Sequence, residues 1–491
     1  MTRRLVCGLL FFLSTGIARA GWTPLTPIAE RGTSFSLLTA VSASGSVFVT
    51  SNSYRDKAYI LRERWSELPE LSDVPGSTIA AAFQDERPIV LLSGADPESN
   101  YAPRLSLARV RGGSWQVSKP VMQFKDGYSE IAWASLIQQG AFSTISVLQY
   151  WLAACGGGEA SVLHSRECQW DECGERYRLT PPFRGDPTWP EGPTVESVGA
   201  GMTPEGVPAV FFQAEGQPRV VQVKLPRGNG ASPLPADFNG IFTPLQVVSG
   251  PPLTVLGVQY IDYEPTGVLT AQRRRGTRDW SVIRHAFDRA GYAGFSACRA
   301  RGNLWAVWDE YGGENTGLFY ASLRGGVWSK ERLVPGSAYC GLYFECKGQR
   351  DYVRALTVAC TDRELHVIWE SERLGLVHTS LAALALDTAE QQGAELLVHG
   401  TGFSDGAQAT LNGSSVRIVS LAGRYLRLTG APNEWRGQLR VRNPNGEEAV
   451  LVLGSTTSSG SWRLPAILGI ALVLARFAAL ALRHKQPARA A

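Results

Sequence analysis

The sequence predicts an all-β chain: a ring of seven four-stranded blades, then a small β-sandwich and a single C-terminal transmembrane helix. Three observations predict this order. Residues 21–390 show short apolar or aromatic strands separated by Gly, Pro, Asn and Asp turns, without helical periodicity. An apolar strand motif and a tryptophan both recur in this part of the chain. From residue 394 onward the pattern changes to alternating strands and then to one long apolar run.

The first 20 residues have the three parts of a secretory signal peptide. Arg3 and Arg4 precede an apolar run over residues 5–13, and residues 18–20 place small side chains where a signal peptidase cleaves. The run is too short to span a bilayer. We therefore expect residues 1–20 to be removed by cleavage before Gly21, and the rest of the chain to be exported.

The recurring apolar motif is the main evidence for a β-propeller. Its copies lie about 40–60 residues apart, which is the length of one four-stranded blade. They are Val47-Phe48-Val49, Ile89-Val90-Leu91-Leu92, Val147-Leu148-Gln149-Tyr150, Ala209-Val210-Phe211-Phe212, Val255-Leu256-Gly257-Val258, Ala306-Val307-Trp308 and Val367-Ile368-Trp369. Tryptophans at the starts of strands that follow tight turns keep the same register, at Trp65, Trp115, Trp170, Trp280 and Trp328. We interpret them as anchors that pack blade against blade.

The two ends of the repeat complement each other. The last unit stops before its tryptophan strand, whereas the mature chain opens with Gly21-Trp22-Thr23-Pro24-Leu25, which has the form of that strand. We therefore predict that the N-terminus completes the last blade, which would remove two exposed sheet edges. Seven blades result over residues 21–390. Six blades are the alternative, because the unit around residues 209–212 is weak.

The strand, turn and Gly-Gly-x-Trp texture of these units resembles sialidase-like (BNR-repeat) β-propellers over about residues 21–390. Of that family's S-x-D-x-G-x-x-W box, Gly112 with Trp115 and Gly325 with Trp328 keep the last two members. The resemblance implies a site on the central face, with an arginine triad, a Tyr/Glu nucleophile pair and an acidic proton donor. The family's Arg-Ile-Pro entry motif is absent from the propeller part of the sequence.

Three acidic residues follow equivalent strands of the last two units, namely Asp309, Glu310 and Glu370. They could place carboxylates near one another at a rim of the ring. We interpret them as exposed acids at strand ends, because carboxylates are rarely buried.

Residues 394–453 contain alternating strands with Asn-Gly and Pro-Asn-Gly turns, which predict a small sandwich. The order of a Gly-x-Gly-Phe strand (400–403), an Asn-Gly turn (412–413) and a final Val-x-Asn-Pro-Asn-Gly hairpin (441–446) closely resembles the IPT/TIG family of immunoglobulin-like modules. That resemblance implies an immunoglobulin-like spacer or interaction unit and no catalysis.

The C-terminal end predicts a membrane anchor. A Ser/Gly/Thr-rich linker over 454–463 leads into the apolar run 464–482, which is interrupted only by Arg476, and then into a basic tail over 483–491. The length of this apolar run and the basic residues that follow it fit one transmembrane span with a cytoplasmic tail. Arg476 is near enough to the cytoplasmic end of the span to extend its guanidinium group to the membrane interface. A sorting tail removed by a transpeptidase is the alternative.

The charge of the exported part argues against nucleic acid as a partner. Seven of the 48 basic residues lie in the two end segments, which leaves 41 basic against 44 acidic residues over 21–463. The seven are Arg3, Arg4, Arg19, Arg476, Arg483, Lys485 and Arg489.

Seven cysteines remain after cleavage, in a chain bound for an oxidising compartment. Cys168 with Cys173, and Cys340 with Cys346, flank short segments, so each pair is a candidate disulfide that clamps a loop. The spacing lacks the second ligand pair of a zinc site, and no nucleotide, nucleophile-elbow or zincin motif is present, so we expect no metal and no cofactor. The odd number leaves at least one thiol unpaired within the chain.

Together these features predict a surface protein with its N-terminus outside the cell and its C-terminus in the cytoplasm. We expect a binding or adhesion protein that presents a propeller face to an extracellular glycan or protein. The alternative is a membrane-tethered glycoside hydrolase of sialidase-like architecture, an exo-acting enzyme with no catalytic residue identifiable from the sequence.

Overall fold

The computed structural model describes residues 22–29, 37–51, 57–71, 76–96, 102–125, 129–152, 159–180, 194–215, 217, 219–239, 241, 245–261, 264–274, 276–277, 279–286, 294–300, 302–310, 317–338, 353–371, 373–382, 384–404, 406–422, 425–430, 435–444 and 447–454. These residues form β-strands and the turns between them. Within the ranges given, no helix has the length and apolar character that a bilayer span requires. The predicted signal peptide, the span 464–482 and the tail 483–491 lie outside the described residues.

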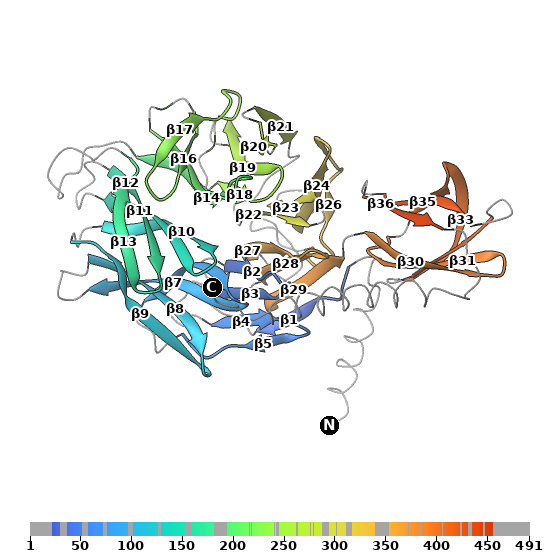
Figure 1. The fold of residues 1–491 in the computed structure, drawn as a ribbon, viewed down its shortest axis with the longest axis horizontal. Helices are drawn as coiled ribbons and strands as arrows, with labels where there is room; N and C mark the ends of the chain where they lie inside the picture. The colour runs from blue at the N-terminus through green and yellow to red at the C-terminus, as the bar shows by residue number, and fades with distance from the viewer. Residues whose placement is uncertain are drawn as a thin grey trace, which may run out of the picture.

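Seven antiparallel sheets stand around a common centre as the blades of a β-propeller (Figure 1). Blade 1 comprises β2 (Leu37–Val41), β3 (Val47–Ser51), β4 (Ala58–Leu61) and β5 (Trp65–Glu67). Blade 2 comprises β6 (Ser77–Gln84), β7 (Arg87–Asp96), β8 (Ala102–Arg111) and β9 (Ser114–Gln123). Blade 3 comprises β10 (Ser129–Gln139), β11 (Phe142–Leu152), β12 (Glu159–Gln169) and β13 (Glu172–Arg178). Each blade runs outward in chain order, so its first strand is the innermost.

Blades 4 to 6 follow the same plan. Blade 4 comprises β14 (Val195–Met202), β15 (Pro208–Ala214), β16 (Val221–Lys224) and β17 (Asn229–Pro233). Blade 5 comprises β18 (Gln246–Val248), β19 (Leu253–Ile261), β20 (Glu264–Arg273) and β21 (Trp280–Ala286). Blade 6 comprises β22 (Phe295–Ala300), β23 (Asn303–Glu310), β24 (Gly317–Arg324) and β25 (Val327–Trp328), and β26 (Arg332–Leu333) also pairs with β24. The weak fourth unit of the sequence is thus a complete blade, and the six-bladed alternative is wrong.

Blade 7 is built from both ends of the ring. It comprises β27 (Val353–Cys360), β28 (Glu364–Ser371), β29 (Gly375–Ala382) and, as its outer strand, β1 (Thr26–Ala29). Thr26 pairs with His378, and Trp22 forms an isolated bridge with Leu381. The predicted closure of the ring by the N-terminus is therefore confirmed.

The core consists of apolar layers between neighbouring blades. The seven recurring motifs of the sequence are the second strands β3, β7, β11, β15, β19, β23 and β28, whose apolar side chains are almost all buried. These strands are apolar on both faces because a blade covers each face. The tryptophans predicted as anchors do pack on these layers, although Trp170 lies in the turn between β12 and β13, with a φ of +58°, and not at a strand start.

A polar or covalent link crosses every junction between blades. In blades 1 to 6 the hairpins that join the first to the second and the third to the fourth strand lie on one face of the ring, together with the β27–β28 hairpin of blade 7. We call this face the hairpin face. The links on or near it are Ser44 N to Glu86 Oε1 (3.1 Å), Gln84 Nε2 to Ala141 O (3.2 Å), Gln139 Nε2 to Gly206 O (2.7 Å), Met202 N to Ser249 Oγ (2.8 Å), Arg299 Nη2 to Thr254 Oγ1 (2.6 Å), the Cys298–Cys360 disulfide, and Thr39 Oγ1 to Val358 O (3.2 Å).

A second group of seven strands lies beside the ring in Figure 1. Its strands are β30 (Ala385–Gln392), β31 (Glu395–Thr401), β32 (Gln408–Leu411), β33 (Ser414–Ala422), β34 (Tyr425–Thr429), β35 (Gly437–Arg442) and β36 (Glu448–Leu453). This group has a core of its own, with Val398, Phe403 and Leu426 at its centre. Among the described residues, Arg324 of the ring donates from Nη1 to Glu448 O of this group (3.3 Å). The first strand begins at Ala385, before the predicted start at residue 394.

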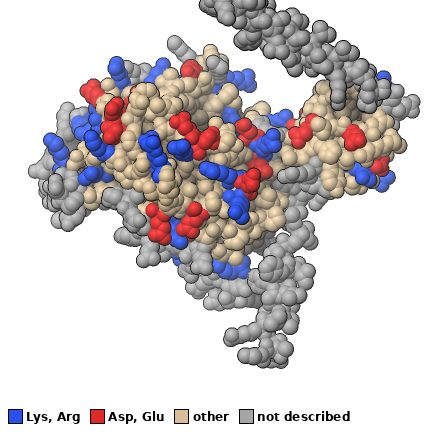
Figure 2. All heavy atoms as spheres, turned by 60° about the horizontal axis from the view of Figure 1, so that its bottom comes forward, with Lys and Arg blue, Asp and Glu red and all other residues tan. Residues whose placement is uncertain are grey.

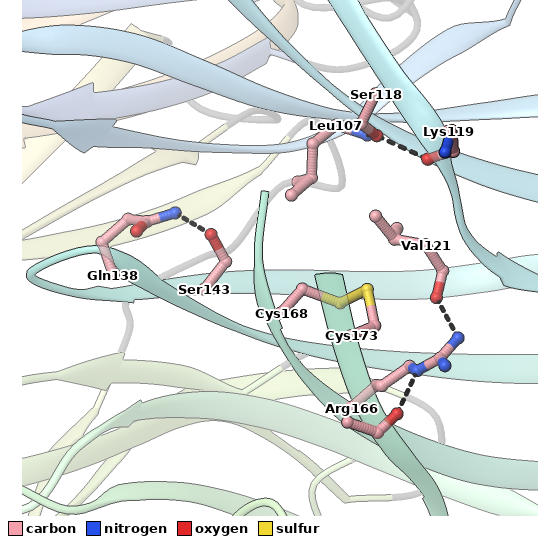
Figure 3. Close-up of a disulfide and its surroundings, with 10 residues drawn as sticks. Leu107, Ser118, Lys119, Val121, Gln138, Ser143, Arg166, Cys168 and Cys173 are labelled. Atoms are coloured by element: carbon pink, nitrogen blue, oxygen red, sulfur yellow. Dashed lines mark hydrogen bonds between the residues drawn. A yellow bond between two sulfur atoms is a disulfide. The ribbon is translucent and has the colours of Figure 1, made fainter. Parts of the chain in front are cut away.

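Cys168 and Cys173 form a disulfide that closes the β12–β13 hairpin, the first of the two candidate pairs (Figure 3). Beside it, Arg166 donates from Nε to Gly174 O (2.7 Å) and from Nη1 to Val121 O in blade 2. A second disulfide, Cys298–Cys360, joins the innermost strands of blades 6 and 7 and was not predicted. The other candidate pair, Cys340 and Cys346, lies outside the described residues.

The two disulfides should differ in their effect on stability. A cross-link restricts the unfolded chain more when it closes a longer loop. The sequence separations are 5 for Cys168–Cys173 and 62 for Cys298–Cys360. Replacing both cysteines by serine should therefore lower the free energy of unfolding by about 2 kcal/mol in the first case and about 4 kcal/mol in the second.

Urea unfolding of the two double variants measures this difference, and each variant is the other's control. Amide exchange should accelerate only around residues 163–178 when Cys168 and Cys173 are replaced. An equal or larger global loss for that pair would contradict the loop-length account.

Candidate functional site

A groove of about 1080 Å³ opens on the hairpin face where blade 7 meets blade 1. Two hairpins of blade 1, residues 42–45 and 61–65, form one wall, and residues 360–364 of blade 7 form the other. Thr23, Thr26 and Pro27 of the closing segment also line the groove. We call this space the seam groove. Its volume is that of a site for a drug-sized or larger ligand.

Charged side chains of both signs stand at the rim of the seam groove. The β4–β5 turn has the sequence Arg62-Glu63-Arg64, and the β27–β28 turn has Asp362-Arg363-Glu364. The turn residues except Glu364 are exposed or nearly so. The two turns thus carry three arginines and three carboxylates, so their formal charges cancel. Figure 2 shows the same mixture of blue and red over the visible face of the ring.

Two buried histidines form the floor of the seam groove. His366 of β28 and His378 of β29 stack with their ring centroids 5.3 Å apart, and His366 Nδ1 lies 3.0 Å from His378 Nε2. Burial lowers the pKa of His378 to about 3, with a further contribution from His366, and burial also lowers the pKa of His366. Both rings are therefore neutral at neutral pH.

Glu364 stands beside this pair at the rim of the groove. Its Oε2 lies 3.8 Å from His366 Nε2, which is too long for a hydrogen bond. The two imidazoles are hydrogen-bonded to each other through His366 Nδ1 and His378 Nε2, so one of these two nitrogens donates and the other accepts. The carboxylate and the two imidazoles thus line the groove from the rim to the floor.

Trp65 stands at the side of this floor. Its ring meets His378 edge to face, with centroids 5.2 Å apart, and it packs on the apolar layer between blades 7 and 1. The side chain is half-buried, so part of the indole remains open to the groove. Trp65 is thus both the predicted anchor and a wall of the site.

Hydroxyl groups along the walls are held by backbone contacts. Thr361 Oγ1 accepts from the N–H groups of Arg363 (3.3 Å) and Glu364 (3.1 Å). Thr23 Oγ1 accepts from the N–H of Ser380 (2.8 Å), which fixes the closing segment to β29. The groove is therefore lined by positioned hydrogen-bonding groups.

A row of serines continues the groove toward blade 2. Ser44 donates to the carboxylate of Glu86 from both its backbone N and its hydroxyl. The hydroxyls of Ser42 and Ser44 lower the pKa of Glu86, which keeps this carboxylate ionised. An adjoining depression of about 390 Å³ lies between Ser44, Arg62 and Glu86.

The acidic residues singled out in the sequence occupy another place. Asp309 and Glu370 lie at the ends of the second strands of blades 6 and 7, on the face opposite the hairpins. Their exposed fractions are only 2% and 1%, so the interpretation as exposed acids is wrong for both. Asp309 Oδ1 accepts from the N–H of Gly294 (3.1 Å), which fixes the approach to β22. Of Glu310, only the backbone position in β23 is described.

Sequence reasoning missed the two histidines and the two charged turns. A signal was present, because Arg62-Glu63-Arg64 stands where blades 2 and 6 have the short turns Gly112-Gly113 and Gly325-Gly326. Among the residues that the structure describes, no three His, Cys, Asp or Glu side chains are grouped closely enough to hold a metal ion.

Comparison with known proteins finds similarity at the level of solved structures. No protein-family model matches the sequence, and no curated protein is significantly similar to it. Among solved structures, the chain is similar to Trypanosoma rangeli sialidase in complex with sialic acid, at 11% identity over 89% of this chain and 90% of that one, with a TM-score of 0.39. It is also similar to Penicillium chrysogenum α-L-arabinanase, at 10% identity over 61% and 96%, with a TM-score of 0.37.

A third similar structure is a subtype N10 neuraminidase-like protein from a little yellow-shouldered bat virus strain, at 12% identity over 74% and 98%, with a TM-score of 0.37. Two of these three structures are thus a sialidase and a neuraminidase-like protein. At these identities and TM-scores we infer neither an activity nor a ligand from the likeness.

The buried histidines should make the chain sensitive to acid. His378 and His164 each have a pKa of about 3 in the folded chain because of burial, against an ordinary value of 6.5. Below pH 6.5 the unfolded chain binds protons that the folded chain does not, so stability is complete above pH 6.5 and is lost as the pH falls toward 3. The expected slope is about 1.4 kcal/mol per pH unit for each histidine.

Urea unfolding at pH 7 and pH 5 tests this expectation, because most carboxylates titrate lower. His378→Gln should lose less stability over this interval than the parent chain. His399→Gln, at an exposed position of β31, is the control and should behave as the parent does. An unchanged slope in His378→Gln would contradict a neutral buried pair.

Proposed function

We propose that this chain is a membrane-anchored binding protein of the extracytoplasmic surface, and that the seam groove is its ligand site. The observation that carries the proposal is the groove itself, about 1080 Å³ between hairpins of two blades and the closing segment. Its polar groups are held by short strands and tight turns, so the site is formed before a ligand arrives. Preorganisation of this kind lowers the entropic cost of binding.

The ends of the sequence support an anchored arrangement. The signal peptide over 1–20 would export the chain, and the apolar run 464–482 with its basic tail would hold it in the membrane. The strands β30–β36 lie between the ring and that run in the sequence. We propose that they are an immunoglobulin-like module of the IPT/TIG type, which acts as a stalk that holds the ring away from the bilayer.

A glycoside hydrolase is the second candidate, and one observation favours it. Glu196 of β14 lies on the face opposite the hairpins, and partial burial together with Glu215 raises its pKa. Glu215 stays hydrogen-bonded to Thr194 Oγ1 (2.9 Å). An acid with a raised pKa near a second carboxylate is the pair that glycosidases use. Hydrolysis of a fluorogenic glycoside that is lost in Glu196→Gln would favour this candidate.

The binding function can be tested with the mature chain in lipid nanodiscs. We expect a glycan array or a displayed peptide library to yield a ligand. That ligand should slow amide exchange in the hairpins at 42–45 and 361–364, because both line the groove. The β16–β17 turn at 225–228, in a distant blade, is the internal control. Failure to bind any member of either library, or protection confined to the opposite face, would contradict the proposal.

A further inference from the structure

We infer that the seam groove binds an uncharged polyhydroxylated ligand, that is, a neutral oligosaccharide segment. The inference rests on the proposed function and names the ligand class for the same site. It places carbohydrate recognition at the edge of the ring where blades 7 and 1 meet. Four features of the groove support it.

The first feature is the balance of charge at the rim. Arg62, Arg64 and Arg363 stand beside Glu63, Asp362 and Glu364, with signs alternating along both turns. Sites for carboxylated sugars need an excess of guanidinium groups, because each anion is bound by paired N–H donors of arginine. Here each guanidinium has an acidic neighbour in the chain. The rim favours ligands without net charge.

The second feature is the neutrality of the floor. Burial keeps His366 and His378 uncharged, so they offer neutral donors and acceptors of hydrogen bonds. An anionic ligand group placed over this floor would lose hydration without gaining an opposite charge. Beside His378 lie the ring of Trp65 and the ring of His366, with the Glu364 carboxylate 3.8 Å from His366 Nε2, and none of these groups supplies a cation.

The third feature is a set of oriented hydroxyls. Thr361 Oγ1 already accepts two backbone N–H groups, so its own hydrogen points away from them and can be donated. Ser42 Oγ accepts from the N–H of Ser46 (3.0 Å) and is bonded to the hydroxyl of Ser44 (3.0 Å), so contacts within the chain fix its position. Sites that present positioned donors and acceptors discriminate strongly for ligand hydroxyls, because a ligand without them leaves buried polar groups unpaired.

The fourth feature is the aromatic wall. A half-buried indole presents an apolar face bordered by polar groups, which matches the alternation of C–H and O–H groups on a sugar ring. Protein interfaces instead have an apolar centre with several buried anchors. Trp65 is the one Trp, Tyr or Phe side chain among the described residues that line the groove, and the rest of the apolar lining is aliphatic, chiefly Pro27, Val41 and Leu61. The observations therefore favour a glycan over a protein segment.

Calorimetric titration of the full chain in nanodiscs tests the inference. The probes are neutral oligomers (cellohexaose, maltohexaose and chitohexaose) and acidic ones (hexagalacturonate and sialyllactose). At least one neutral oligomer should bind, with a Kd that changes little on raising the ionic strength. Trp65→Ala should weaken it about tenfold or more. Trp115→Ala is the matched control, because Trp115 lies in the same slot of blade 2, packed on the layer between blades 1 and 2 and outside the groove.

Two further variants keep the test decisive if Trp65→Ala fails to fold. Trp65→Phe should keep most of the affinity. Glu63→Gln combined with Asp362→Asn leaves an excess of arginine at the rim, and it should gain affinity for hexagalacturonate.

Three results would overturn the inference: preference of the parent chain for the acidic oligomers, equal losses in Trp65→Ala and Trp115→Ala, or no binding of any neutral oligomer. Each of these leaves the proposed binding function open to a peptide or acidic ligand, which the library screen detects separately.

Discussion

Blade 7 has four strands only because β1 (Thr26–Ala29), which precedes the other six blades in the sequence, pairs with β29. Thr26 faces His378 across this pairing, and Thr23 bonds to Ser380 through both backbone and hydroxyl groups. Trp22 adds apolar burial, since its ring packs on Tyr320 at 5.2 Å in the layer between blades 6 and 7. Without this pairing, β29 would be an unpaired edge of a three-stranded blade, and the apolar layer between blades 6 and 7 would lose Trp22.

The same constraint accounts for the position of the seam groove. At the other junctions the neighbouring blades come from consecutive parts of the chain, whereas at this one the walls come from opposite ends. The closing segment contributes Thr23, Thr26 and Pro27, and the charged turns of blades 1 and 7 stand on either side. A ligand in the groove would contact both ends of the ring. A ligand that binds only the closed ring would stabilise ring closure by mass action, and a stably closed ring would in turn bind the ligand more tightly.

The sequence allowed the propeller to be predicted because each second strand is covered on both faces and is therefore almost wholly apolar. Outer strands were harder to predict from the sequence, because many residue types are tolerated at positions exposed to solvent. The outer strand β17, for example, has no tryptophan to mark it. Most of β30 was assigned to the propeller, although it belongs to the separate strand group. The site was largely missed. His366 and His378 become neighbours through strand pairing, and Cys298 meets Cys360 because the innermost strands of adjacent blades face each other. These residues are brought together only when the strands pair and the ring closes, so no local pattern in the sequence marks them as neighbours.

Deletion of residues 21–29 tests the role of the closing segment most directly, with deletion of residues 385–453, which removes the whole separate strand group from β30 onward, as its counterpart. Both variants would be followed by thermal unfolding of the ring. The account predicts that removing 21–29 strongly lowers or abolishes the cooperative transition, because an edge of blade 7 becomes exposed and Trp22 is lost from the core. Removing 385–453 should leave the melting of the ring unchanged. Equal effects of the two deletions would contradict it.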